Sequence, residues 1–254
     1  MKIFSILSER RELVANLVSR ELKSKYKGSA LGFLWSILTP LFMAAIYVFF
    51  LRLLAGRGVS VENIIIGVFA WQFTSLCVTG GMMCVSGNSN LVKKVYFPRL
   101  IIPLSKSISA LMDLLIVMII LAGMIIFYQI PLSWQSLMFL PFILMAILAG
   151  IAFGIWVSAL SIRFRDFTHI LPLVLRIGMF LSPIAYGATL VPHTYKWAFN
   201  LNPLTGIIEG CRWALFNTPL DVGSIWMSMV VILVVLLGGV WYFLRMDQYI
   251  ADVI

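Results

Sequence analysis

The sequence is poor in charged residues for a chain of its length. Asp, Glu, Lys and Arg make up 11% of the 254 residues, whereas a soluble domain has about 25%. Hydrophobic residues make up 61%, more apolar surface than a globular core of this size can bury. The composition therefore excludes a soluble domain and predicts an integral membrane protein.

Side chains that commonly serve catalysis or bind metals are also scarce. The two histidines, His169 and His193, are far apart in the sequence, and the cysteines, Cys77, Cys84 and Cys211, include no CxxC spacing. The chain contains no HExxH, Walker A, GxSxG or paired-Asp motif. We therefore expect no catalytic centre, no metal or cofactor, and no ATP hydrolysis on this chain.

The formal net charge of +9 does not indicate nucleic-acid binding. Most of the Lys and Arg residues occupy the short gaps between apolar runs, which is the pattern that membrane insertion produces. We expect no nucleic-acid partner.

The apolar residues form six runs, each close to the roughly 20 residues that cross a bilayer. We expect an all-α fold with six transmembrane helices in a permease domain, residues 30–254, preceded by an N-terminal segment, residues 1–29. The approximate limits of the runs are 30–53, 63–86, 106–129, 137–160, 169–189 and 223–244.

The basic residues predict the orientation of these helices. Fourteen Lys and Arg residues lie on the side of the two termini and four on the opposite side, with Arg176 inside the fifth run. Because basic residues concentrate in cytoplasmic loops, we expect both termini in the cytoplasm.

Residues 8–27 form a basic amphipathic pattern. Val14, Val18 and Leu22 recur every four residues, while Arg20 and Lys23 fall on other faces. The pattern predicts a helix in the headgroup layer. A solvated helix beside the membrane is the alternative.

A second amphipathic segment follows the fifth run. Asn202 is suited to cap a helix that begins at Pro203, with Glu209 and Arg212 on its polar face. About 13 residues reach about 20 Å, too short to cross a bilayer. We expect a re-entrant helix on the outer side, or alternatively a surface helix without a functional part.

Asp113 and Arg176 are the two charges that fall well inside apolar runs. Because unpaired charge in lipid is costly, we predict that they form a salt bridge. Contact with a substrate and coupling to an ion are the alternatives.

Two groups of aromatic residues lie in suggestive places. Trp35, Phe42 and Phe49 recur at seven-residue steps and share one helix face, which suits either a sugar path or plain lipid and helix contact. Aromatic and basic residues also mix in the loop 90–103, where Phe97 precedes a proline that ends any helix. A plain connector does not need such residues, so we predict that this loop docks into a partner. Its candidate docking residues are Lys93, Lys94, Tyr96, Phe97, Pro98 and Arg99.

Four segments together resemble one family. RELKSKYKGSALGFLWSILTPL (20–41), NLVKKVYFPRLIIPLS (90–105), SIRFRDFTHILP (161–172) and LNPLTGIIEGCRWAL (201–215) are similar, in that order, to the permeases of bacterial polysaccharide ABC exporters. The segment VYFPRLIIP is most similar to O-antigen exporter permeases, while teichoic-acid and capsule exporter permeases are relatives.

This resemblance implies a homodimer in the inner membrane that works with two copies of a separate ATPase, which binds the ATP and Mg. The expected substrate is a polysaccharide linked to undecaprenyl pyrophosphate. The resemblance also makes 161–168 a second coupling loop, with Arg163, Arg165 and Asp166, and assigns the aromatic face to the sugar path. The basic residues expected to meet the pyrophosphate are Arg20, Lys23, Lys25 and Lys27.

Three other functions compete with this one. A drug or lipid exporter permease of the same superfamily is the strongest alternative. A secondary transporter would show an inverted repeat, and we find none. A membrane-bound transferase would need a catalytic cluster that the sequence lacks.

Overall fold

The computed structural model describes residues 11–28, 31–55, 61–84, 97–164, 166–184, 186–187 and 191–253. All the regular elements in these ranges are helical. The main helices are α2 (Arg11–Tyr26), α3 (Leu34–Ala55), α4 (Val61–Met83), α6 (Ile101–Phe127), α7 (Phe139–Arg163), α8 (Phe167–Leu181), α10 (Pro203–Phe216) and α11 (Val222–Val253). Three short helices complete the described elements: η3 (Trp134–Met138), η5 (His193–Tyr195) and α9 (Lys196–Asn200).

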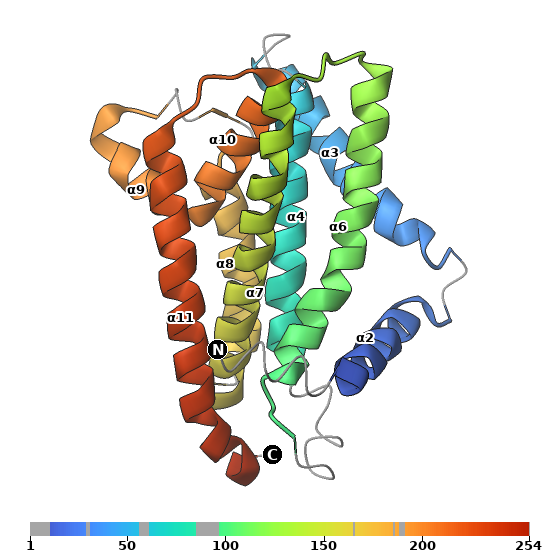
Figure 1. Ribbon diagram of the computed structural model, residues 1–254, viewed down its shortest axis with the longest axis vertical. Coiled ribbons are helices and arrows are strands. Elements are labelled where there is room, and N and C mark those ends of the chain that lie inside the picture. The colour runs from blue at the N-terminus through green and yellow to red at the C-terminus, as the bar shows by residue number, and fades with distance from the viewer. Residues whose placement is uncertain are drawn as a thin grey trace.

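Four helices are long and apolar enough to cross a membrane, and they run along the length of the molecule (Figure 1). They are Val61–Met83, Ile101–Phe127, Trp134–Arg163 and Val222–Met246. Two shorter apolar helices, Leu34–Phe50 and Phe167–Leu181, coincide with the first and fifth predicted runs. The chain is thus an all-helical, multi-pass membrane protein in the part described.

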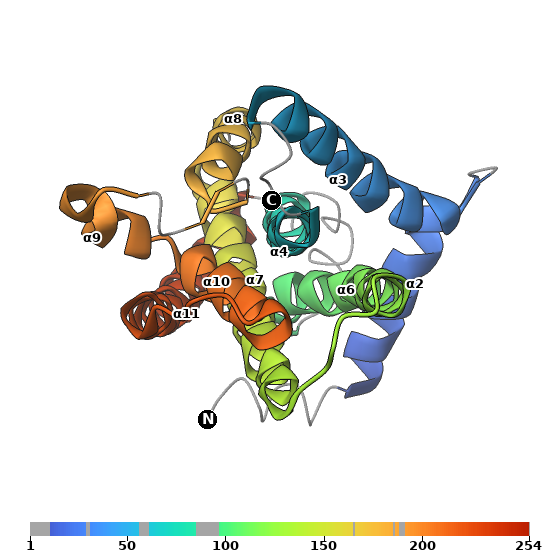
Figure 2. The ribbon, with the colours of Figure 1, turned by 90° about the horizontal axis from the view of Figure 1, so that it is seen from above.

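The centre of the bundle is formed by α4 and α7, and α3 lies along an outer edge (Figure 2). Glycines bring the two central helices together, because a Cβ atom on Gly81 would lie 2.2 Å from the carbonyl oxygen of Gly154. Close backbone approach through small residues is a common way for membrane helices to pack.

A tryptophan joins α7 to α11. Trp156 donates its indole N–H to the carbonyl oxygen of Val235 at 2.7 Å and stacks on Tyr242 with 5.4 Å between ring centroids. Gly239 leaves room for the indole, since a Cβ atom there would lie 2.6 Å from Trp156 Cδ1. The indole N–H of Trp156 therefore has its hydrogen-bond acceptor within the bundle.

The amphipathic pattern near the N-terminus is confirmed as α2, although its apolar face contacts protein. Val14 and Leu17 are buried in one cluster with Leu100, Ile101 and Phe243. This packing fixes α2 against the beginning of α6.

The predicted start of α10 is also confirmed. Asn202 accepts a hydrogen bond from the backbone N–H of Leu204 at 3.0 Å, and Pro203 is the first helical residue. Twelve of the fourteen residues of α10 are buried, among them Glu209 and Arg212. The helix is therefore a part of the core, and the alternative of a surface helix is wrong.

Candidate functional site

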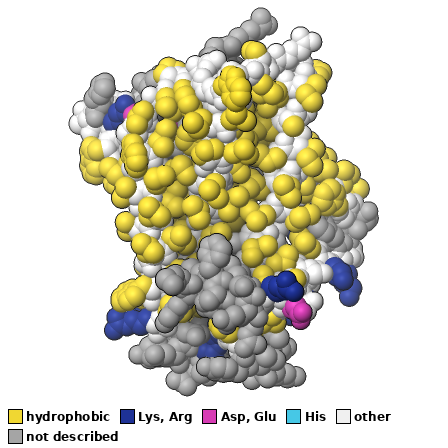
Figure 3. Space-filling model, in the orientation of Figure 1, with side chains coloured by type: hydrophobic (Ala, Val, Ile, Leu, Met, Phe, Trp, Pro, Cys, Tyr) yellow, Lys and Arg dark blue, Asp and Glu magenta, His cyan; other side chains and the backbone are white. Residues whose placement is uncertain are grey.

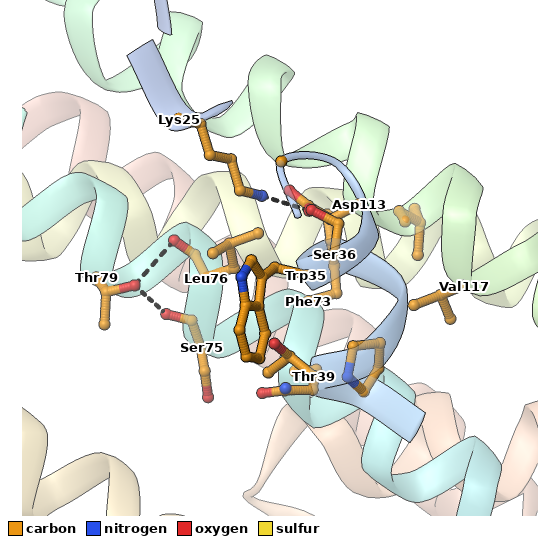
Figure 4. Close-up of a pocket in the computed structure, with 14 residues that line it drawn as sticks. Lys25, Trp35, Ser36, Thr39, Phe73, Ser75, Leu76, Thr79, Asp113 and Val117 are labelled. Carbon is orange, nitrogen blue, oxygen red and sulfur yellow. Dashed lines mark hydrogen bonds and ion pairs between the residues drawn. The ribbon is translucent and has the colours of Figure 1, made fainter. Parts of the chain in front are cut away.

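A cavity of about 410 Å³ lies between α3, α4 and α6, beside the end of α2 (Figure 4). Most of its lining is aromatic or aliphatic, and polar side chains are interspersed among these residues. Its lining residues are Lys25, Gly32, Trp35, Ser36, Thr39, Pro40, Gln72, Phe73, Ser75, Leu76, Thr79, Asp113, Leu114 and Val117.

An ion pair between Lys25 of α2 and Asp113 of α6 stands on the cavity wall. The predicted salt bridge between Asp113 and Arg176 is therefore wrong, because Asp113 pairs with Lys25 in the structure. Arg176 lies exposed on α8. The sequence prediction failed because it sought a partner for Asp113 only inside the apolar runs, whereas α2 packs on α6 and brings an ammonium group to the carboxylate.

A second ion pair, between Lys106 of α6 and Glu21, ties the same two helices together. It lines a neighbouring cavity of about 360 Å³. The two cavities share Lys25, Leu76, Thr79 and Asp113, so they are two parts of one groove beneath α2, which is largely apolar and contains two ion pairs.

The structure separates the residues that the sequence assigned to a substrate path. Trp35 lines the cavity and is 51% exposed, whereas Phe42 and Phe49 lie further along α3, at 58% and 64% exposure, away from the cavity. Among the four basic residues of this path, Lys25 reaches the cavity, while the other three are exposed on or just after α2. Those three are Arg20, Lys23 and Lys27.

Polar residues on α4 were not singled out from the sequence. Gln72, Ser75 and Thr79 all line the cavity. Their spacing of three and four residues puts them on one face of a helix that is otherwise strongly apolar. A polar stripe inside a transmembrane run was the signal that would have found this wall.

The prediction that Phe97 of the first coupling loop docks into a partner is wrong. Its side chain is 6% exposed and packs in the cluster of Val14, Leu17 and Phe243, so it anchors the loop inside the chain and is not free to dock into a partner. Pro98 and Arg99 are half-buried. Lys93, Lys94 and Tyr96 lie outside the described residues.

The second loop is described except for Arg165. Arg163 ends α7 and is exposed, with its guanidinium 5.3 Å from the ring centre of Phe164. Asp166 precedes α8 and is exposed as well. These two charges are placed where another protein can reach them.

Arg212 of α10 connects three parts of the chain. Its guanidinium donates to the carbonyl oxygens of Asn63 at 2.8 and 3.1 Å, Ile184 at 3.0 Å and Tyr186 at 3.2 Å, and to Glu209 at 3.0 Å. An arginine that donates mainly to backbone has a structural role, so we place Arg212 and Glu209 outside the functional site.

Metal chemistry finds no support in the described ranges. They contain no group of three or more His, Cys, Asp or Glu side chains that could hold an ion. The three cysteines are buried thiols that form no disulfide.

Membrane-length helices beside a cavity that holds an ion pair are typical of a transport protein. The sequence profile of the ABC-2 type transporter matches residues 12–216, and the chain belongs to that family. Its members are membrane components of transporters and not enzymes.

Three relatives resemble the chain over most of its length, and each is described as an O-antigen export system permease protein RfbA. One from Klebsiella pneumoniae is 28% identical over 250 residues, 96% of this chain and 95% of the relative. A second from the same organism is 28% identical over 83% of this chain and 82% of its own. One from Myxococcus xanthus is 27% identical over 91% and 90%. The predicted resemblance to O-antigen exporter permeases is thereby confirmed.

Proposed function

We propose that this chain is the transmembrane subunit of an ABC exporter that moves a polysaccharide linked to undecaprenyl pyrophosphate, of the O-antigen type, across the inner membrane. The observation that carries the proposal is the likeness to O-antigen permeases over 96% of the chain. In this proposal two copies of the chain work with two copies of an ATPase subunit, which binds ATP and Mg.

The proposed topology has six spans, with residues 1–29 and both termini in the cytoplasm. The distribution of charge supports it, because on the face in Figure 3 hydrophobic side chains cover the middle and most Lys and Arg side chains gather at the lower end. α10 is then a re-entrant helix, since its 14 residues reach only about 21 Å and both its neighbours in the chain approach it from one end of the bundle.

The proposed homodimer is supported by apolar surface on the two shorter apolar helices. Phe42 and Phe49 of α3 are exposed, and so are Leu173, Ile177 and Phe180 of α8. Besides lipid, a second copy of the chain is a suitable cover for such a surface.

Coupling to the ATPase is assigned to the two loops predicted from the sequence. In the first loop, Lys93, Lys94, Tyr96, Pro98 and Arg99 remain candidates, without Phe97. In the second, the candidates are Arg163, Arg165 and Asp166. Exposure of Arg163 and Asp166 supports this assignment.

Deletion of the chain tests the function directly. In cells that make the glycan, lipid-linked polysaccharide should accumulate on the inner leaflet and return to the surface when the chain is restored. The purified chain should hydrolyse no ATP and should form an ATPase only with its partner. Unchanged surface glycan with altered drug resistance would favour a drug exporter, and hydrolysis by the chain alone would contradict the proposal.

A further inference from the structure

We infer that the cavity beneath α2 is a saccharide-binding site, which holds a short neutral stretch of the exported glycan within each protomer. This inference rests on the proposed function and adds to it the place where sugar, as distinct from the lipid pyrophosphate, is bound. The volume of about 410 Å³ falls in the range of small-molecule pockets, about 300–1,000 Å³.

The charge of the cavity favours a neutral ligand. Among the described residues that line it, Lys25 and Asp113 are the ionisable ones, and they form an ion pair with one another. Their charges cancel, so the cavity offers an anion such as pyrophosphate no net attraction. The carboxylate still has lone pairs that can accept from ligand hydroxyl groups.

The α4 wall offers hydrogen-bonding groups to a ligand. The hydroxyl oxygen of Ser75 is buried without a hydrogen-bond partner. Gln72 adds an amide, and Thr79 donates to the carbonyl oxygens of Ser75 and Leu76, which leaves its own oxygen able to accept. A buried hydroxyl without a partner is costly, and Gln72 and Thr79 beside it offer donors and acceptors to a hydroxyl-rich ligand.

The opposite wall, formed by α3, presents one aromatic side chain. Trp35 extends from α3 beside the Lys25–Asp113 pair, with half of its surface exposed (Figure 4). Phe73 and Leu76 add apolar surface to the same cavity. A sugar ring has apolar C–H faces and a rim of hydroxyl groups, so a cavity lined by both apolar and polar side chains matches it. A lipid chain would leave the polar wall unsatisfied.

The groove beneath α2 supplies a route into the cavity. Its neighbouring part is lined by Glu21, Ser24, Lys106 and Ser109, and continues through Lys25 and Asp113. A saccharide can thus meet polar groups along the whole groove, while the exposed basic residues of α2 remain outside for an anionic group.

Photo-crosslinking in cells tests the inference. A benzoylphenylalanine residue replaces Gln72 in the cavity or, as control, Leu144, an exposed apolar residue of α7. Irradiation should give a glycan-bearing adduct at Gln72 and none at Leu144. The adduct should vanish when the first sugar-transferring step of glycan synthesis is blocked. Trp35→Ala should lower its yield on the order of tenfold, whereas Trp35→Phe should retain most of it.

A second crosslinking position, Thr39 on the opposite wall, should give the same adduct and guards against a local defect at Gln72. Membrane level and glycan export of each variant are measured in the same cells. The saccharide site would be overturned by a phospholipid adduct that forms both in cells that make the glycan and in cells whose glycan synthesis is blocked. Export without a glycan adduct at either position would overturn it as well. If deleting the chain leaves glycan export intact, the proposed function itself fails, and the two failures are thus distinguishable.

Discussion

Arg212 and Glu209 form a buried ion pair within one turn of α10, with Nη1 of the arginine 3.0 Å from Oε1 of the glutamate. The remaining donors of the guanidinium bind the backbone of residues near the start of α4 and after α8. Because α10 is too short to cross a bilayer, this arginine is a principal polar link that fixes it to its neighbours.

Loss of Arg212 should therefore destabilise the chain strongly. Arg212→Met removes the arginine that pairs with the buried Glu209 carboxylate and donates to three carbonyl groups, and should cost about 3–5 kcal/mol. Thermal unfolding in detergent measures the effect. Arg176→Met is the matched control, because Arg176 is exposed, and it should unfold near the wild-type temperature. Equal losses from the two variants would contradict the role of Arg212.

The Lys25–Asp113 pair predicts energetic coupling between α2 and α6. Lys25→Gln and Asp113→Asn should each lower stability, and the double variant should lose less than the sum by about 1 kcal/mol. The same cycle with Arg176→Gln in place of Lys25→Gln should be additive. Coupling in the second cycle and additivity in the first would show that Asp113 pairs with Arg176, as predicted from the sequence.

Close packing of α4 on α7 predicts opposite effects for two Gly→Ala changes. Gly81→Ala places a Cβ atom 2.2 Å from the backbone oxygen of Gly154, which cannot move aside, and should cost about 1–3 kcal/mol or more. Gly123→Ala meets no atom within 4 Å and should stabilise α6 by about 0.5–1 kcal/mol. Thermal unfolding decides between them, and a neutral Gly81→Ala would show that the helices are further apart.

Acid should weaken the junction of α9 and α11. The pKa of the Asp221 carboxyl lies below its usual 3.8, chiefly because of its hydrogen bond with Lys196, whose Nζ is 2.8 Å away. Since the folded-state pKa is lowered, this stabilisation is complete above pH 3.8 and is lost as the pH falls through the folded-state value.

Hydrogen exchange of residues 193–202 as a function of pH measures this effect. Protection should decline as the solution is acidified below about pH 4. Asp221→Asn should remove that pH dependence while it keeps an oxygen able to accept from the backbone N–H of Gly223. The same decline in Asp221→Asn would assign it to another group.

Neighbouring aromatic residues of the first loop should fail in different ways. Phe97→Ala opens a hole in the cluster that holds α2, and should cost about 3–5 kcal/mol of stability. Tyr96→Ala should leave the purified chain stable and weaken co-purification of the ATPase, because an aromatic anchor at an interface contributes about 2 kcal/mol or more. Stable Phe97→Ala protein that has lost the ATPase would show that Phe97 is the contact after all.

Periodic features of this protein could be predicted from the sequence. All six apolar runs became helices, α2 has the amphipathic pattern of its residues, and Asn202 with Pro203 begins α10. These features depend on residues close together in the chain, through hydropathy, helical spacing and capping. The likeness to O-antigen permeases was equally local, since it rested on four short segments.

Partners distant in the sequence were decided by the tertiary structure. Asp113 is 88 positions along the chain from Lys25, and Phe97 is buried in a cluster to which α2, α6 and α11 all contribute. Arg212 binds a carbonyl group 149 residues away. Burial in lipid requires that each such charge have a partner, but it does not say which. The choice depends on which helices lie side by side, and packing between glycines and bulky side chains determines that.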